Sequence, residues 1–205
     1  MSQNRASVGI DLYWLPLGAG GHSVRWNGRV YEAVSALLER RAAAALYHSA
    51  LVVTIPPDNW VIEMTPVWSG NGGGDRGVVA EGSVGARWAG RIPAFRYEVR
   101  CWPGGSIADL AEAVASPIRL TADEATCRRL LTLIPSVPAH VWGRDELGAG
   151  EMWNSNSVTS WALARASIVA ADIHPPRGGR APGWRAGILA ARLAQRPEPL
   201  RSRRP

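Results

Sequence analysis

The sequence contains no lysine, and all 23 of its basic residues are arginine. Lysine nucleophiles, Schiff bases and the lysine of a phosphate-binding loop are therefore excluded. Cysteine is also scarce: Cys101 and Cys127 are the only two, and neither they nor the four histidines have the close spacing of metal ligands. We therefore expect two packed thiols, no metal site and no cofactor.

Long apolar runs are missing as well. No stretch approaches the roughly 18 consecutive apolar residues that cross a membrane, and the polar start, Met1 to Arg5, lacks the apolar region of a signal peptide. We expect a cytoplasmic protein with no membrane span. The hydrophobic content of 46% is enough to build the core of one domain from the 205 residues.

The net charge of +6 is unevenly distributed. Residues 177–205 carry eight arginines and a single acidic residue, Glu198, whereas the rest of the chain is close to neutral. This pattern predicts one domain over residues 1–176 and a basic Arg/Pro-rich tail over 177–205, partly helical or disordered. A basic tail can contact nucleic acid, but a solvated chain end is the more common outcome. Nucleic acid is therefore not the partner we expect.

Strand patterns dominate the first half of the chain and helix patterns the second. Apolar or alternating runs predict strands at residues 8–15, 48–54, 60–64 and 95–101. An Asn-Gly turn predicts a hairpin over residues 22–31, and residues 78–88 fit either state. Helical spacing predicts helices at 32–47, 106–115, 121–134, 155–171 and 185–195. This segregation favours an α+β fold over a doubly wound sheet.

The best candidate for a chemical site is the segment from Trp153 to Val158, which reads Trp-Asn-Ser-Asn-Ser-Val. It lies where a glycine-rich loop enters an apolar helix, and small polar side chains favour helix N-termini. A nucleophile there has unpaired backbone N–H groups and the positive end of the helix dipole beside it. Both features stabilise an oxyanion.

Two motifs together carry a resemblance to a known family. His48 opens the strand His-Ser-Ala-Leu-Val-Val, and the Asn-Ser-Asn-Ser motif opens a later helix. This order resembles that of the permuted NlpC/P60 papain-like superfamily, which includes the lecithin:retinol acyltransferase-like and PPPDE groups. The sequence is most similar to an uncharacterised bacterial branch with His-Thr-Trp-Ile-Ala and Pro-Asn-Ser-Asn-Thr-Phe segments. The resemblance spans roughly residues 48–165 and implies an antiparallel sheet packed against a nucleophile-bearing helix.

The resemblance assigns roles to particular residues. Ser155 falls where the family has its catalytic cysteine, His48 becomes the general base, and Glu63 on the neighbouring strand is our candidate for the group that orients His48. Trp153, Asn154 and Asn156 form the binding and oxyanion neighbourhood of Ser155. His22 is a rival for the histidine role. Each residue also has a structural interpretation: Ser155 as a first-turn residue, and His48 as a hydrogen-bonded strand histidine.

Two functions follow. The first is a hydrolase or acyltransferase in which Ser155 attacks an amide, ester or thioester of a small-molecule or peptide substrate. The second is an inactive relative that uses the cleft to bind a peptide, a lipid or a protein partner. The second is slightly favoured, because a serine hydroxyl, unlike a thiol, needs a general base in hydrogen-bond reach. The sequence indicates no oligomeric state.

Overall fold

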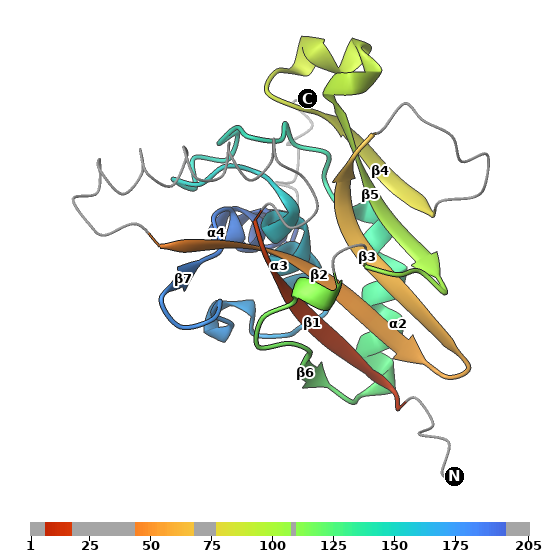
Figure 1. Cartoon of the computed structure of the whole chain (residues 1–205). Helices are drawn as coiled ribbons and strands as arrows, with labels where there is room; N and C mark the ends of the chain where they lie inside the picture. The colour runs from red at the N-terminus through yellow and green to blue at the C-terminus, as the bar shows by residue number, and fades with distance from the viewer. Residues whose placement is uncertain (1–6, 18–43, 68–76, 108–109, 196–205) are drawn as a thin grey trace, which may run out of the picture.

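The computed structural model describes residues 7–17, 44–67, 77–107 and 110–195, which form an α+β fold (Figure 1). A seven-stranded sheet has its strands in the order β4-β5-β3-β2-β1-β6, and every neighbouring pair on this path is antiparallel. The short strand β7 lies off the path and pairs in parallel with β2. The α+β prediction is therefore confirmed.

The elements have the following bounds. The strands are β1 (Gly9–Pro16), β2 (Ala45–Ile55), β3 (Asp58–Pro66), β4 (Val78–Ser83), β5 (Arg96–Pro103), β6 (Ile118–Thr121) and β7 (Gly179–Arg180). The α-helices are α2 (Glu124–Leu133), α3 (Ser155–Arg165) and α4 (Trp184–Leu193). Short 3-10 turns are η1 (Arg87–Arg91), η2 (Pro93–Phe95), η3 (Leu110–Glu112), η4 (Ile134–Ser136) and η5 (Ala170–Asp172).

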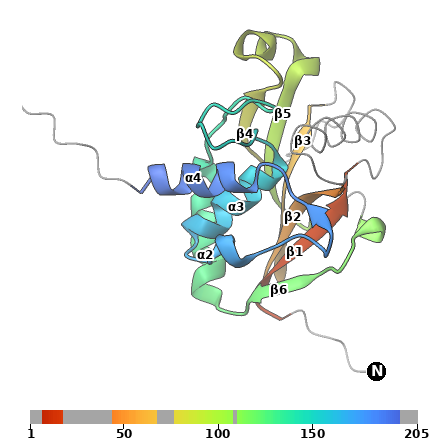
Figure 2. The same ribbon diagram turned by 90° about the vertical axis from the view of Figure 1, so that its left-hand side faces the viewer.

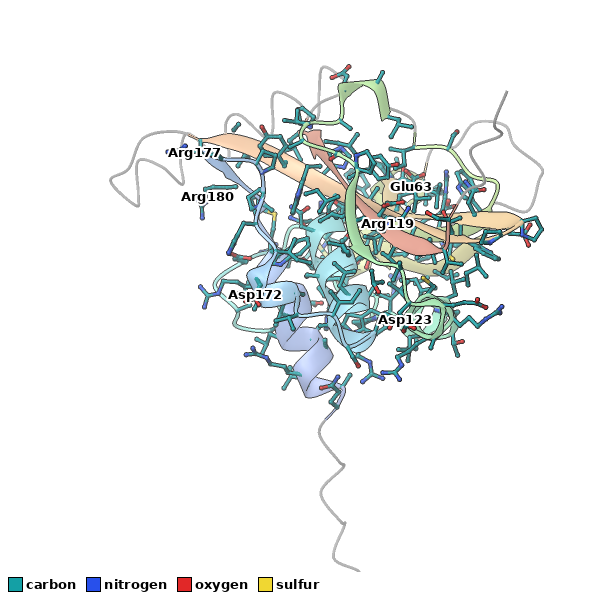
Figure 3. The ribbon with its side chains drawn as sticks, turned by 90° about the horizontal axis from the view of Figure 1, so that it is seen from below. Glu63, Arg119, Asp123, Asp172, Arg177 and Arg180 are labelled. Atoms are coloured by element: carbon teal, nitrogen blue, oxygen red, sulfur yellow. The ribbon has the colours of Figure 1, made fainter. Side chains whose placement is uncertain are left out.

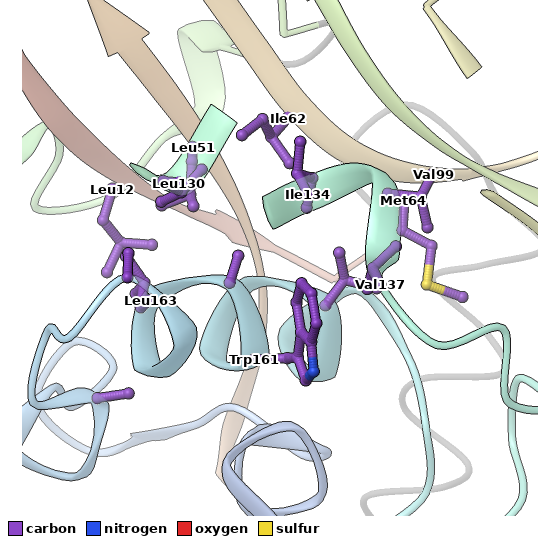
Figure 4. Packing of buried hydrophobic residues seen from close by; sticks show 14 of the residues in the cluster. Leu12, Leu51, Ile62, Met64, Val99, Leu130, Ile134, Val137, Trp161 and Leu163 are labelled. Atoms are coloured by element: carbon purple, nitrogen blue, oxygen red, sulfur yellow. The ribbon is translucent and has the colours of Figure 1, made fainter. Parts of the chain in front are cut away.

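The helices lie in layers on one face of the sheet (Figure 2). Helices α2 and α3 pack on the central strands, and α4 packs on α3 on the side away from the sheet. The main core fills the space between the sheet and these helices (Figure 4). Its largest fully buried side chains include Trp14 on β1, Leu51 on β2 and Trp161 on α3. Burial of this apolar surface is the main force that seats the helices on the sheet.

A second, smaller apolar cluster lies on the opposite face of the sheet. It contains Leu15 from β1, Ala50 from β2, Val61 from β3 and Ile107 from the segment after β5. Because successive side chains of a strand point to opposite faces, these residues alternate with the main-core residues of the same strands. Membership in one cluster or the other therefore shows to which face of the sheet each residue of β1, β2 and β3 points.

The four strands predicted from apolar or alternating runs are confirmed. The pair predicted at 48–54 and 60–64 is the antiparallel hairpin of β2 and β3, and β1 and β5 lie where 8–15 and 95–101 were expected. The ambiguous stretch at 78–88 divides into β4 and the start of η1. The predicted hairpin over 22–31 and most of the helix predicted at 32–47 lie outside the described residues, but residues 45–47 belong to β2.

The helix predicted at 106–115 is wrong. The described part of this segment holds only the short turn η3, and the chain then continues into β6. The Val114 N–H donates to Trp14 O at 2.9 Å, and the Trp14 N–H donates to Ser116 Oγ at 2.9 Å. The edge of β1 thus holds the segment in a non-helical path, and Ala115 has a φ of 49°, which a right-handed helix does not accommodate.

The two predicted helices that follow differ from expectation at one end each. Helix α2 begins at Glu124 and not at residue 121, because Asp123 caps it: the Asp123 carboxylate accepts the Thr126 N–H at 2.8 Å. Helix α3 ends at Arg165 instead of continuing to residue 171, because Ser167 adopts a φ of 70° and the chain turns away.

Helix α4 confirms the helix predicted at 185–195 and belongs to the core. Trp184, Ala190 and Ala191 lie in the main apolar cluster, and the Trp184 ring packs 5.2 Å from that of Trp14 on β1. The segment expected as a tail from residue 177 therefore contains the strand β7 and a packed helix, and residues 196–205 lie outside the described part. In the described residues, no helix has the length and apolar character needed to span a membrane.

Candidate functional site

The N-terminus of α3 is capped by side chains of its own first turn. Asn154 is the N-cap, and its Oδ1 accepts the N–H groups of Asn156 at 2.9 Å and Ser157 at 3.4 Å. Ser157 Oγ in return accepts the Asn154 N–H at 3.0 Å, which completes a capping box. The sequence predicted unpaired N–H groups beside Ser155 that would hold an oxyanion. Two of those groups are instead bound to the Asn154 side chain.

Asn156 joins three distant parts of the chain. Its Nδ2 donates to Tyr47 O and to Pro182 O, both at 2.9 Å, and its Oδ1 accepts from Ser49 Oγ at 2.9 Å. The side chain is only 1% exposed, so all of these bonds form out of contact with bulk water. Asn156 thus fastens α3 to β2 and to the chain that leads into α4.

Two serines of α3 form further hydrogen bonds to the chain at the start of α4. Ser157 Oγ donates to Gly183 O at 2.8 Å, and Ser160 Oγ donates to Trp184 O at 2.8 Å. The two helices approach closely at Gly187 of α4, where a Cβ atom would lie 2.0 Å from Ser157 O. The small polar residues of the motif therefore satisfy buried backbone groups and allow α3 and α4 to approach each other. We call Asn154, Asn156, Ser157 and Ser160, with Ser49 on β2, the polar seam.

Ser155 itself lies in the first turn of α3 and is 8% exposed. Within the described part of the chain, its hydroxyl has no hydrogen bond to a histidine, aspartate or glutamate. A serine nucleophile requires a general base in direct or water-bridged reach. Among the described residues, none forms a direct hydrogen bond of this kind with Ser155.

His48 lies on the face of the sheet opposite to Ser155. Its neighbour Ser49 points toward α3, since the Ser49 hydroxyl bonds to Asn156. Side chains alternate along a strand, so His48 points the other way, together with Ala50 of the second apolar cluster. The cross-strand partner of His48 is Leu15, which belongs to the same cluster. The central sheet therefore separates the predicted base from the predicted nucleophile.

Glu63 lies on the same face as His48. On β3, Ile62 and Met64 belong to the main core and Val61 belongs to the second cluster, so alternation places Glu63 on the face away from α3. Figure 3 shows Glu63 at the level of the strands and Asp172 among the helices below the sheet. The structure thus brings His48 and Glu63 to one face and leaves Ser155 on the other. The rival histidine, His22, lies outside the described residues.

Trp153 is a core residue. It is 1% exposed, belongs to the main apolar cluster, and meets the His140 ring edge-on with the ring centroids 4.8 Å apart. The structure therefore gives Trp153, Asn154 and Asn156 roles in packing and hydrogen bonding at the start of α3.

A histidine–carboxylate pair escaped the sequence analysis. His140 Nδ1 lies 3.3 Å from Glu146 Oε2, and the same carboxylate group accepts the Val141 N–H and the Arg87 guanidinium. Burial opposes ionisation of Glu146, but these hydrogen bonds and the charge of Arg87 outweigh it and hold the pKa of Glu146 below its usual range. The space that His140 and Glu146 enclose with Trp153 has no room for a water molecule. The pair therefore braces a loop and has no place for a substrate. Two polar residues six positions apart in a loop give no signal in a single sequence.

The cysteines are packed thiols, as predicted. Both are free, and Cys127, on α2, is fully buried. Burial raises the pKa of the Cys101 thiol to about 11, and burial followed by the charge of Asp123 raises that of Cys127. Neither thiol is activated as a nucleophile.

An open groove lies beside α4. It has a volume of about 470 Å³ and runs between the outer face of α4 and the chain after η5, with Gly148 and Ala149 at its border. Its side-chain lining combines apolar and basic residues, namely Ile173, His174, Trp184, Arg185, Ile188 and Arg192. Among the described residues, no group of three or more His, Cys, Asp or Glu side chains is placed to hold a metal ion. The groove is thus concave, partly apolar and basic.

Comparison with known proteins adds no relative. No protein-family model, no curated protein and no solved structure matches this chain.

Proposed function

We propose that this protein is a non-catalytic binding module, an inactive variant of the permuted papain-like plan. One observation carries the proposal: the central sheet lies between Ser155 and His48, the two residues that the acyl-transfer mechanism requires to meet. Proton transfer needs a heavy-atom separation of about 2.6–3.2 Å, or one bridging water. Residues on opposite faces of a packed sheet do not meet this condition.

The polar seam supports the same proposal. An acyl-transfer site needs donors held ready for the oxyanion, but the Asn156 and Ser157 N–H groups are bound by Asn154. The motif that resembles a nucleophile site therefore has a sufficient structural reason, because it seats α3 on β2 and against α4. A helix that opens at this motif and packs on an antiparallel sheet fits the papain-like plan without its chemistry.

A serine-directed fluorophosphonate probe tests the proposal. We expect the full chain to show no labelling above that of Ser155→Ala, because no histidine or carboxylate of the described residues is bonded to the hydroxyl to deprotonate it. The control is Ser136→Ala, since the Ser136 hydroxyl lies exposed at the end of η4. Labelling that is strong in the full chain and in Ser136→Ala but lost in Ser155→Ala would overturn the proposal and establish a serine acyl-transfer enzyme.

A further inference from the structure

The groove beside α4 has the composition of a ligand site. Arg185 and Arg192 stand seven residues apart on α4, which places them about two turns and roughly 10 Å apart on one side of the helix. Ile188 and Leu189 lie between them and line the same groove. Its volume of about 470 Å³ falls in the range of small-molecule sites, about 300–1,000 Å³.

The basic groups of the groove have no partner among the residues that the structure describes. In the described part of the chain, the guanidinium groups of Arg185 and Arg192 and the ring of His174 form no hydrogen bond or ion pair. No acidic side chain lines the groove. The Glu151 carboxylate accepts the backbone N–H of Arg185 at 2.9 Å, so it contacts the backbone of Arg185 and not its guanidinium. Arginine presents a planar fork of donors that matches carboxylate and phosphate groups.

We propose that the groove binds a small amphipathic anion, with a carboxylate or phosphate group held by Arg185 and Arg192 and an aliphatic body packed on Ile173, Ile188 and Leu189. This inference rests on the proposed binding role and names the ligand class. The carboxylate and the phosphate share one chemistry here, namely an oxyanion that accepts from arginine. The apolar residues between the arginines distinguish this ligand from a simple inorganic anion.

Two other occupants fit the groove less well. The chain that follows α4, residues 196–205, carries four arginines and one glutamate, so it would bring like charge to Arg185 and Arg192. A second copy docked symmetrically would do the same, because a twofold interface sets one surface against itself. An anion of small size avoids both repulsions.

Isothermal titration calorimetry of the full chain with four probes tests the proposal. We expect decanoate and decyl phosphate to bind, and decanol and inorganic phosphate each to bind at least about tenfold more weakly. The affinities of the charged probes should fall as the salt concentration rises, whereas that of the uncharged decanol should not. Equal binding of decanol and decanoate would overturn the role of the arginines, and absence of binding by both decanoate and decyl phosphate would overturn the site.

A double variant locates the binding. We expect Arg185→Gln/Arg192→Gln to reduce decanoate affinity at least about tenfold with an unchanged circular dichroism spectrum. The control Arg91→Gln/Arg177→Gln makes the same change of charge at two exposed arginines outside the groove and should bind as the unmodified chain does. Equal loss in both variants would show nonspecific charge attraction and overturn the proposal. These results are separate from the labelling of Ser155: a groove that binds nothing leaves the non-catalytic assignment intact, whereas labelling at Ser155 refutes that assignment whatever the groove binds.

Discussion

The two sides of the α3–α4 pair use polar residues in opposite ways. On the inner side, the side chains of Asn154, Asn156, Ser157 and Ser160 are all bonded to groups of the protein itself. On the outer side, Arg185, Arg192 and His174 line an open groove with no such partner among the described residues. Polar groups that are buried and paired fix a structure, whereas those left unpaired at a concave surface are available to a ligand. The polar groups at the start of α3 therefore hold the structure together, and those of the groove are open to a ligand.

Of the substitutions considered, Asn156→Ala should cause the largest loss of stability, because it disrupts the hydrogen bonds on the inner side of the α3–α4 pair. It removes three hydrogen bonds and leaves Tyr47 O and Pro182 O without this donor in a buried place. We expect the free energy of unfolding to fall by about 2–4 kcal/mol, measured by urea denaturation. Ser155→Ala, one residue away, is the matched control. A loss below about 0.5 kcal/mol for Asn156→Ala, the size typical of surface substitutions, would contradict the structural role of the seam.

Gly187→Ala sets two effects of opposite sign against each other. Alanine favours a helix over glycine by about 1 kcal/mol, but its Cβ would lie 2.0 Å from Ser157 O and 2.1 Å from Ser160 Oγ. The first of these is a backbone atom of a buried helix and cannot rotate away. We expect the clash to prevail, with a net loss of about 1–3 kcal/mol in unfolding free energy, measured by thermal denaturation. A gain in stability would show that α3 and α4 are not closely fitted at this point.

Acidification should destabilise the protein through the loop that contains Glu146, by less than the two substitutions above. The pKa of Glu146 is lower in the folded protein than its usual value of 4.5. The stabilisation is therefore present above that value and is lost as the pH falls through the folded pKa. We expect the urea midpoint to fall on acidification below pH 4.5, and to fall less in Glu146→Gln. An identical pH profile in both proteins would show that Glu146 has no part in the loss.

Ser155→Ala should have the smallest effect. The Ser155 hydroxyl has no hydrogen bond in the described residues, so its removal leaves no buried group without a partner. We expect a change in unfolding free energy within about 0.5 kcal/mol and a thermal midpoint close to that of the unmodified chain. A large loss would mean that the hydroxyl has a structural partner, and the comparison with Asn156 would then fail.

Local patterns in the sequence predicted much of the fold. The alternating run at 95–101 and the apolar run at 48–54 became β5 and β2, because a strand that buries one face carries that period in its residues. The helix predicted at 106–115 failed for a reason outside the segment, namely the hydrogen bonds that Val114 and Ser116 form with Trp14, about a hundred positions earlier. Short-range spacing does not contain such tertiary contacts.

The sequence predicted that a helix begins at the candidate site, but it did not predict how the side chains there are arranged. The motif at Asn154 was expected to open a helix, and it does so as a capping box. The face of β2 that His48 occupies depends on the register between β2 and α3, which the bond from Ser49 to Asn156 reveals. A shift of one residue would have turned His48 toward α3, and nothing in the sequence of an apolar strand distinguishes the two registers.

The bonds of Asn156 also have a consequence for the order of folding. Its side chain connects Tyr47, 109 positions earlier, with Pro182, 26 positions later. These bonds exist only once β2, α3 and the chain before α4 are all in place, and the entropy of closing such long loops is lost before the contacts form. The polar seam therefore stabilises the assembled molecule more than its folding transition state. Loss of the seam should accelerate unfolding far more than it slows refolding.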